Sequence, residues 1–239
     1  MGIYTIKRKL TQRAYQLFCA FYYRFAFGRE TRLATKLARI VNSWEQRKRR
    51  GDVPVSSETW ETQYQTGKWK YMEQLSEFPR YSTIIGYIAF LKLGGAILDV
   101  GCGEGILFER YRPYGYSKYL GIDISQVALA KLTQKQDENT SFVKADVETY
   151  EPTEDFDVII FNETLYYFHE PLKVFKRYTR ALKEDGIIIV ETYVASQRAI
   201  SILQKLKTIY SLLDETKTTH KATSTSWICS VFVLPHKDE

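Results

Sequence analysis

Three glycines and two aspartates are the residues whose types and spacing point most clearly to chemistry. Gly101, Gly103 and Gly105 form a GxGxG loop between an apolar run and a helical pattern. Glycines in such a loop allow a sharp backbone turn and the close approach of a ligand. A tight strand-to-helix turn that binds nothing would need the same residues, so the glycines alone leave both interpretations open.

The two aspartates extend this pattern along the chain. Asp123 ends the second apolar run, roughly 20 residues after the glycines, where an acid can accept hydrogen bonds from ribose hydroxyls. Asp146 closes the third run, where an acid can contact the exocyclic amine of a purine. The structural alternatives are a helix N-cap for Asp123 and a turn residue at a strand end for Asp146.

The elements that must position these residues alternate between strands and helices. Short apolar runs predict buried strands, and helical patterns between them are typical of βαβ units in a parallel sheet. The gap at 148–155 is too short for a helical crossover between the third and fourth strands. Residues 214–226 are polar and rich in threonine. The expected strands are 96–100, 119–123, 141–145, 156–161, 186–191 and 227–234, and the expected helices are about 104–113, 125–135, 170–183 and 196–213.

Five segments, in this order and spacing, resemble the class I S-adenosylmethionine-dependent methyltransferases. They are ILDVGCGEG at 97–105, GIDIS at 121–125, KADV at 144–147, FDVIIF at 156–161 and LKEDG at 182–186. The resemblance implies an α/β fold with a Rossmann-like, seven-stranded, mostly parallel sheet, an antiparallel last strand and a helical N-terminal cap. It also implies S-adenosylmethionine as the cofactor.

The resemblance further implies roles for single residues. The glycines would contact the methionyl part of the cofactor, with Asp99 fixing their loop and reaching the cofactor amine. Asp123 would hold the ribose, and Asp146 with Val147 would flank the adenine. The full set of expected cofactor contacts in this region is Asp99, Gly101, Gly103, Gly105, Asp123, Ile124, Asp146, Val147 and Asn162.

The segment NETLYYFHEP at 162–171 follows the fourth strand, where this family places the acceptor. It lacks the Asn/Asp-Pro-Pro-aromatic box of enzymes that methylate base amines and the Pro-Cys nucleophile of cytosine C5 enzymes. It also lacks the second acid of the protein-arginine enzymes. These absences disfavour nucleic acid and arginine acceptors. The string NETLYY looks most like small-molecule methyltransferases, including the N-methyltransferases of nodulation-factor aminosugars.

Within this segment, three side chain types could act on an acceptor. Glu163 could hold a cationic amine or orient a hydroxyl, and the imidazole of His169 could act as a general base. Tyr166 and Tyr167 could line the pocket or contact the sulfonium through cation–π interactions. The structural alternatives are a residue at a helix start for Glu163, a solvated cap for His169 and core packing for the tyrosines.

The chain before the sheet divides into two parts, ahead of a methyltransferase domain at 93–239. Residues 51–92 are expected to form a helical cap or lid. In it, Tyr64 and Trp69 are candidates to cover the cofactor, and Arg80 to approach the cofactor carboxylate. The alternative is that the aromatic residues only dock the helix.

Residues 1–50 form the other part, predicted to be a basic helical extension. They hold 13 Lys and Arg residues but two acids, whereas the whole chain has a net charge of +6. Three interpretations compete: contact with an anionic membrane surface, electrostatic binding of nucleic acid, and packing of a helical pair on another subunit of a homo-oligomer.

The three cysteines are far apart and form no CxxC pair, which argues against a disulfide framework and a zinc site. No metal site is expected. A reducing cytoplasmic location fits this cysteine usage, with peripheral attachment to a membrane as a variant. No transmembrane helix is expected, and a transit peptide, though free of acids over residues 1–29, would lack its usual serines.

The sequence therefore predicts a methyltransferase that acts on N or O of a small polar metabolite, with a sugar or glycoconjugate as the leading acceptor. Two alternatives remain open at this point. One is an RNA methyltransferase that uses the basic N-terminus for affinity, and the other is a cofactor-binding interaction protein without catalysis.

Overall fold

The computed structural model describes residue 18 and residues 55–234. The predictions for residues 1–50, including the basic extension and its membrane, nucleic-acid or subunit contacts, lie outside the described residues. Within the described part, no helix has both the length and the apolar character needed to cross a membrane.

A seven-stranded sheet forms the centre of the molecule, with strand order β3-β2-β1-β4-β5-β7-β6. The first five strands pair in parallel, whereas β7 pairs antiparallel with both β5 and β6. This arrangement confirms the predicted Rossmann-like, mostly parallel sheet. The strands are β1 (Gly94–Val100), β2 (Tyr116–Asp123), β3 (Thr140–Lys144), β4 (Phe156–Asn162), β5 (Leu182–Tyr193), β6 (Ser211–His220) and β7 (Thr225–Val233).

Helices cover both faces of the sheet. One face packs against α4 and α5 and the other against α7 and α8, because successive buried strand residues point to opposite sides. Between β3 and β4 no described helix forms, as the short gap predicts. The α-helices are α3 (Ser57–Gln65), α4 (Phe78–Leu91), α5 (Ile106–Tyr111), α6 (Gln126–Ala130), α7 (Pro171–Tyr178) and α8 (Gln197–Ile209).

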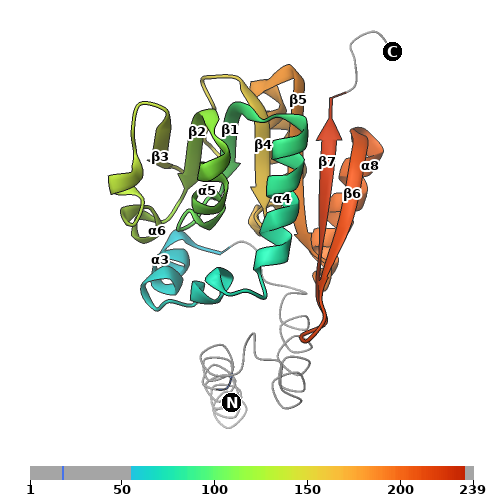
Figure 1. Ribbon diagram of the computed structural model, residues 1–239. Helices are drawn as coiled ribbons and strands as arrows, with labels where there is room; N and C mark the ends of the chain where they lie inside the picture. Colours follow the sequence, from blue (N-terminus) through green and yellow to red (C-terminus); the bar gives the residue numbers. More distant parts are fainter. Residues whose placement is uncertain (1–17, 19–54, 235–239) are drawn as a thin grey trace.

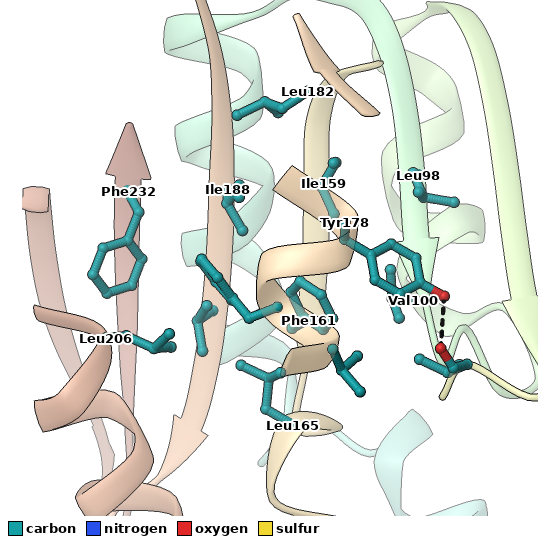
Figure 2. Packing of buried hydrophobic residues seen from close by; sticks show 14 of the residues in the cluster. Leu98, Val100, Ile159, Phe161, Leu165, Tyr178, Leu182, Ile188, Leu206 and Phe232 are labelled. Carbon is teal, nitrogen blue, oxygen red and sulfur yellow. Dashed lines mark hydrogen bonds between the residues drawn. The ribbon is translucent and has the colours of Figure 1, made fainter. Parts of the chain in front are cut away.

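The core beneath α7 and α8 is built from large aromatic and branched side chains (Figure 2). Phe161 of β4 stacks on Phe175 of α7 with ring centroids 5.6 Å apart. The Tyr178 hydroxyl donates a hydrogen bond to the Val147 carbonyl at 3.2 Å, drawn as a dashed line in Figure 2. This bond ties the connection after β3 to the core, although that connection has no helix of its own.

The prediction of one helix over 196–213 is wrong at its C-terminal end. The helix ends at Ile209, and residues 211–220, read in part as a polar stretch, form β6 at the edge of the sheet. The register shifts between Leu212 and Asp214, so that Leu213 sits in a bulge and is half exposed. The bulge interrupts the alternation of side chains that is typical of a strand. In the sequence, Leu213 therefore continues the helical spacing of the apolar residues before it.

Candidate cofactor and acceptor site

A cavity of about 400 Å³ lies where the carboxyl ends of the parallel strands meet the segment that runs from α3 to α4. Figure 1 shows α3 across this end of the sheet. Ligands of open α/β sheets bind in such a crevice, and the volume is typical of small-molecule sites. A smaller pocket of about 40 Å³ shares part of its wall, including Tyr64, Arg80 and Gly101.

The glycine loop between β1 and α5 uses positive φ angles, with φ +77° at Gly101, +55° at Gly103 and +76° at Gly105. A Cβ on Gly101 would lie 2.5 Å from Cγ2 of Thr164, and one on Gly103 would lie 2.7 Å from the Tyr64 hydroxyl. These two glycines line the pockets. Gly105 lines neither pocket, since a Cβ there would instead meet the side chain of Leu132.

Asp99 sits beneath this loop and is almost fully buried. Its Oδ2 accepts a hydrogen bond from the Tyr119 hydroxyl at 2.7 Å, and burial raises the pKa of the carboxyl from 3.8 to about 7. Its Oδ1 is buried without a hydrogen-bond partner among the described residues. Because Asp99 also lines the smaller pocket, this acceptor is available to a donor on a ligand.

Asp123 lies at the end of β2 and lines the larger cavity. Its carboxylate accepts hydrogen bonds from the backbone N–H groups of Gly103 and Ser125, both at 2.9 Å. Burial raises its pKa from 3.8 to about 6, against the lowering effect of these bonds. Asp123 therefore supports the glycine loop and also lines the cavity. It is not the N-cap of α6, because that residue is Ser125.

The neighbouring wall contains the residues predicted to meet the adenine. Ile124, Asp146 and Val147 all line the larger cavity. Oδ1 of Asp146 accepts a hydrogen bond from the Glu148 backbone N–H at 2.9 Å, which makes Asp146 a turn residue as well as a wall residue. The structure therefore places residues that follow β2 and β3 on one wall of the cavity, and their contact with adenine stays a prediction.

The segment before the sheet supplies the opposite wall, with both Tyr64 and Trp69 lining the cavity. Trp60 stacks on Trp69 with centroids 5.6 Å apart and meets Tyr167 edge-on at 4.9 Å. Glu61, which the sequence analysis missed, links α3 to α6. Its carboxylate accepts hydrogen bonds from the Ser125 hydroxyl and from two backbone N–H groups at 2.6–3.0 Å.

Arg80 projects from the first turn of α4 and is buried against the end of β4. Its Nε pairs with Glu77 at 2.8 Å, Nη1 donates to Oδ1 of Asn162 at 2.7 Å, and Nη2 donates to the Tyr81 hydroxyl at 3.0 Å. Both Arg80 and Asn162 line the two pockets. The pKa of Arg80 is held above its ordinary value by the acidic groups around it, including Glu77 and Glu163, despite burial.

Glu163 follows β4 directly and adopts a left-handed φ of 62°, which is uncommon for a residue with a side chain. Its Oε2 accepts a hydrogen bond from the Tyr166 hydroxyl at 2.8 Å, and both residues line the cavity. Strained backbone of this kind clusters at functional sites. Glu163 does not begin an α-helix, so the helix-start alternative does not describe it.

His169 lies at the rim of the cavity with 64% of its side chain exposed. Its Nδ1 lies 2.7 Å from Oε1 of Glu148, and its backbone N–H donates to the same carboxylate. A proton on Nδ1 would leave Nε2 as the acceptor nitrogen. Glu148 is the second acid, after Glu61, that could not be predicted from the sequence. Its partner His169 lies 21 positions away, and no local pattern connects the two.

Glu191 is a third missed acid, buried on β5 between Asn162 of β4 and Cys229 of β7. Within the described part of the chain no N–H or hydroxyl group donates to its carboxylate, and the Cys229 thiol is its hydrogen-bonding neighbour. Burial raises its pKa from 4.5 to about 8; Arg80 lowers it and Glu163 raises it further. The apolar run at 186–191 predicts a buried strand, but nothing in the sequence shows that the acid at its end is buried with it.

The shifted pKa of Glu191 predicts a pH-dependent stability. Between about pH 5 and pH 8 the folded protein keeps a proton that the unfolded chain releases, so the contribution of this group is lost as the pH rises. The free energy of unfolding should fall by up to about 1.4 kcal/mol per pH unit from this group. Urea unfolding of Glu191→Gln should show a flatter pH dependence than the unmodified protein. Exposed Glu138→Gln is the control, and equal slopes for all three proteins would refute the assignment.

The described residues contain no group of three or more His, Cys, Asp or Glu side chains that could hold a metal ion. Cys102 and Cys229 are both buried free thiols. The chemically reactive side chains that line the larger cavity are carboxylates, aromatic side chains, Arg80 and His169.

Comparison with known proteins assigns this architecture to a family. The methyltransferase-domain family matches residues 91–229, which is more than half of the chain. The chain therefore belongs to this family. Its fold and family define a class I methyltransferase domain with S-adenosylmethionine as its cofactor.

Individual relatives cover different parts of the chain. Trans-aconitate 2-methyltransferase of Rhizobium etli is 32% identical over 98 residues, which are 39% of this chain and 37% of that protein. The chain thus matches well under half of this relative's length. The N-methyltransferase NodS of Bradyrhizobium japonicum, solved with S-adenosylhomocysteine, superposes with a TM-score of 0.61 at 18% identity, over 70% of this chain and 92% of NodS.

A second solved structure is similar in fold. It is the 1,6-didemethyltoxoflavin-N1-methyltransferase of Burkholderia thailandensis, with a TM-score of 0.64 and 15% identity over 78% of this chain and 94% of that chain. At these identities the two structures establish the shared fold alone.

The residues of the site fit the cofactor. The buried Oδ1 of Asp99 has no donor within the described residues, and Asp99 lines the smaller pocket, where an amino group would supply one. Gly101 and Gly103 expose bare backbone to the pockets where a Cβ would collide with Thr164 or the Tyr64 hydroxyl, and Asp123 lies on the cavity wall.

Proposed function

We propose that this protein transfers a methyl group from S-adenosylmethionine to N or O of a small polar metabolite, with amino sugars and other glycoconjugates as the first acceptors to test. The observation that carries the proposal is the cavity itself. It joins the glycine loop and Asp123 to a wall formed by Glu163, Tyr166 and His169.

Each part of the cavity has a role in binding or transfer. Bound S-adenosylmethionine supplies an electrophilic methyl group on sulfur. Asp99, Gly101 and Gly103 would hold its methionyl end, and Asp123 its ribose. Arg80, already placed by Glu77 and Asn162, adds a positive charge next to the methionyl end.

The residues after β4 would then align the acceptor. Positioning two reactants for an in-line transfer is itself a large source of rate enhancement. Glu163, held by Tyr166, can bind an amine or a hydroxyl. His169, oriented by Glu148, can remove the proton that a hydroxyl acceptor must lose.

Two variants test this assignment. Glu163→Gln and His169→Ala should each lower turnover at least tenfold, as loss of an acid–base or orienting group does, while leaving cofactor affinity within twofold. Transfer is measured as labelled methyl incorporation into a panel of amino sugars, sugar nucleotides and RNA. Glu170→Gln, which changes an exposed carboxylate of the same segment, is the matched control. Turnover equal to that of the unmodified protein would remove the residue concerned from the site.

A further inference from the structure

Acidic side chains outnumber basic side chains on the wall of the larger cavity. Its described lining contains five carboxylates but a single Lys or Arg side chain, Arg80. The carboxylates belong to Glu77, Asp123, Asp146, Glu148 and Glu163. Bound S-adenosylmethionine carries one net positive charge, so the wall remains anionic when the cofactor is in place.

Arg80 offsets one of these five charges, and its guanidinium is already engaged by protein groups. Each of its three nitrogens has a partner, in Glu77, Asn162 and the Tyr81 hydroxyl. The guanidinium also lies over the Tyr81 ring at 4.2 Å from the centroid. An anionic acceptor would therefore enter a cavity in which the described residues offer no uncommitted cation, and it would face several carboxylates.

Aromatic faces accompany the acids on the acceptor side. Tyr166, Tyr193 and Trp227 all line the larger cavity and are absent from the smaller pocket at the methionyl end. The ring of Trp227 makes a cation–π contact with Arg80, whose guanidinium lies 5.8 Å from the ring centroid. Electron-rich rings combined with carboxylates are the arrangement by which proteins bind ammonium groups.

A further acid lies behind this wall. The backbone N–H of Glu163 donates to the carbonyl of Glu191 at 3.1 Å, so the two acids are joined through the ends of β4 and β5. Glu191 is buried, and the Cys229 thiol is its hydrogen-bonding neighbour among the described side chains. The pKa of Glu191 is raised to about 8 by burial, so this acid is protonated at neutral pH and the negative charge near β4 is that of Glu163.

We propose that the acceptor is an amine that enters the cavity as an ammonium ion and is held by Glu163 against the aromatic faces of Tyr166 and Trp227. This inference rests on the proposed function and specifies its substrate class. Before transfer, the ammonium gives a proton to the Glu163 carboxylate, which passes it to solvent. The amine lone pair then forms the N–C bond as the S–C bond breaks, and that electron pair returns to sulfur.

The proposal is tested with three phenyl compounds of similar size and different charge: benzylamine, benzyl alcohol and benzoate. Calorimetry first establishes that the protein binds S-adenosylhomocysteine, and each probe is then titrated into the loaded complex at neutral pH. We expect benzylamine, present as its ammonium ion, to bind at least tenfold more tightly than benzyl alcohol, and benzoate to bind most weakly. Failure to bind S-adenosylhomocysteine would count against the proposed function rather than the substrate class.

Variants of two nearby acids complete the test. Glu163→Gln should lower the affinity for benzylamine at least fivefold and leave that for benzyl alcohol within twofold, whereas Glu170→Gln should change neither. Unchanged affinity for S-adenosylhomocysteine shows that the Glu163 variant is folded. If a loaded complex prefers benzoate, binds benzyl alcohol as tightly as benzylamine, or binds no benzylamine at millimolar concentration, the acceptor is not a cationic amine.

Discussion

Asp123→Ala is expected to weaken the binding of S-adenosylmethionine more than tenfold. The Asp123 carboxylate faces the cavity, and a hydrogen bond from a ribose hydroxyl to a charged group contributes about 1.5–3 kcal/mol. The same carboxylate accepts the N–H groups of Gly103 and Ser125, so its removal also loosens the glycine loop. Calorimetric titration of the variant with the cofactor measures both effects together.

Asp137→Ala is the matched control for this variant. Asp137 also accepts a backbone N–H, that of Asn139, but it is exposed before β3 and does not line the cavity. Its loss should therefore leave cofactor affinity unchanged. Thermal unfolding of both variants separates a folding defect from a binding defect. If Asp123→Ala binds the cofactor as tightly as the unmodified protein, the ribose assignment is wrong.

Gly101→Ala should damage both the fold and the binding of the cofactor. A Cβ at φ +77° is strained by about 1–2 kcal/mol, and this one would also lie 2.5 Å from Cγ2 of Thr164. Overpacking of this kind costs about 1–3 kcal/mol, because the β-branched neighbour cannot turn away freely. We therefore expect a loss of about 2–5 kcal/mol in the free energy of unfolding and an affinity at least tenfold lower.

Two further variants separate the strain from the collision. Gly115 has a similar φ of +81°, but no atom lies within 4 Å of a Cβ placed there, so Gly115→Ala should cost only its backbone strain and spare cofactor binding. Thr164→Ser removes the methyl group that Gly101→Ala would meet. The double variant should thus recover part of the lost affinity. Normal cofactor binding by Gly101→Ala alone would show that this turn does not carry the methionyl end.

The parallel half of the fold could be predicted because its signals are local. The apolar runs that form β1 and β4 are buried on both faces, and the glycines and Asp123 follow strands at fixed offsets. The edge strand β6 could not, since most of its residues are exposed and the bulge at Leu213 interrupts the alternation. Its pairing with β7 is a tertiary event that no local window contains.

The residues of the candidate site also divide into those with a local sequence signal and those that only tertiary contacts bring together. Tyr64, Trp69 and Arg80 were found among the aromatic and basic residues before the sheet, and the structure places all three on the cavity wall. Glu61 was missed because its partners, at the start of α6, lie more than 60 positions away. Glu191 was missed for a related reason, because only the assembled sheet shows that its carboxylate is buried beside Cys229 of β7.

The central claim is that the crevice at the carboxyl ends of β1, β2 and β4 is an S-adenosylmethionine site. Calorimetric titration of the unmodified full chain with S-adenosylmethionine, and separately with S-adenosylhomocysteine, tests it most directly. We expect both compounds to bind at micromolar concentration with one ligand per chain. The absence of binding by either compound to the folded protein would contradict it.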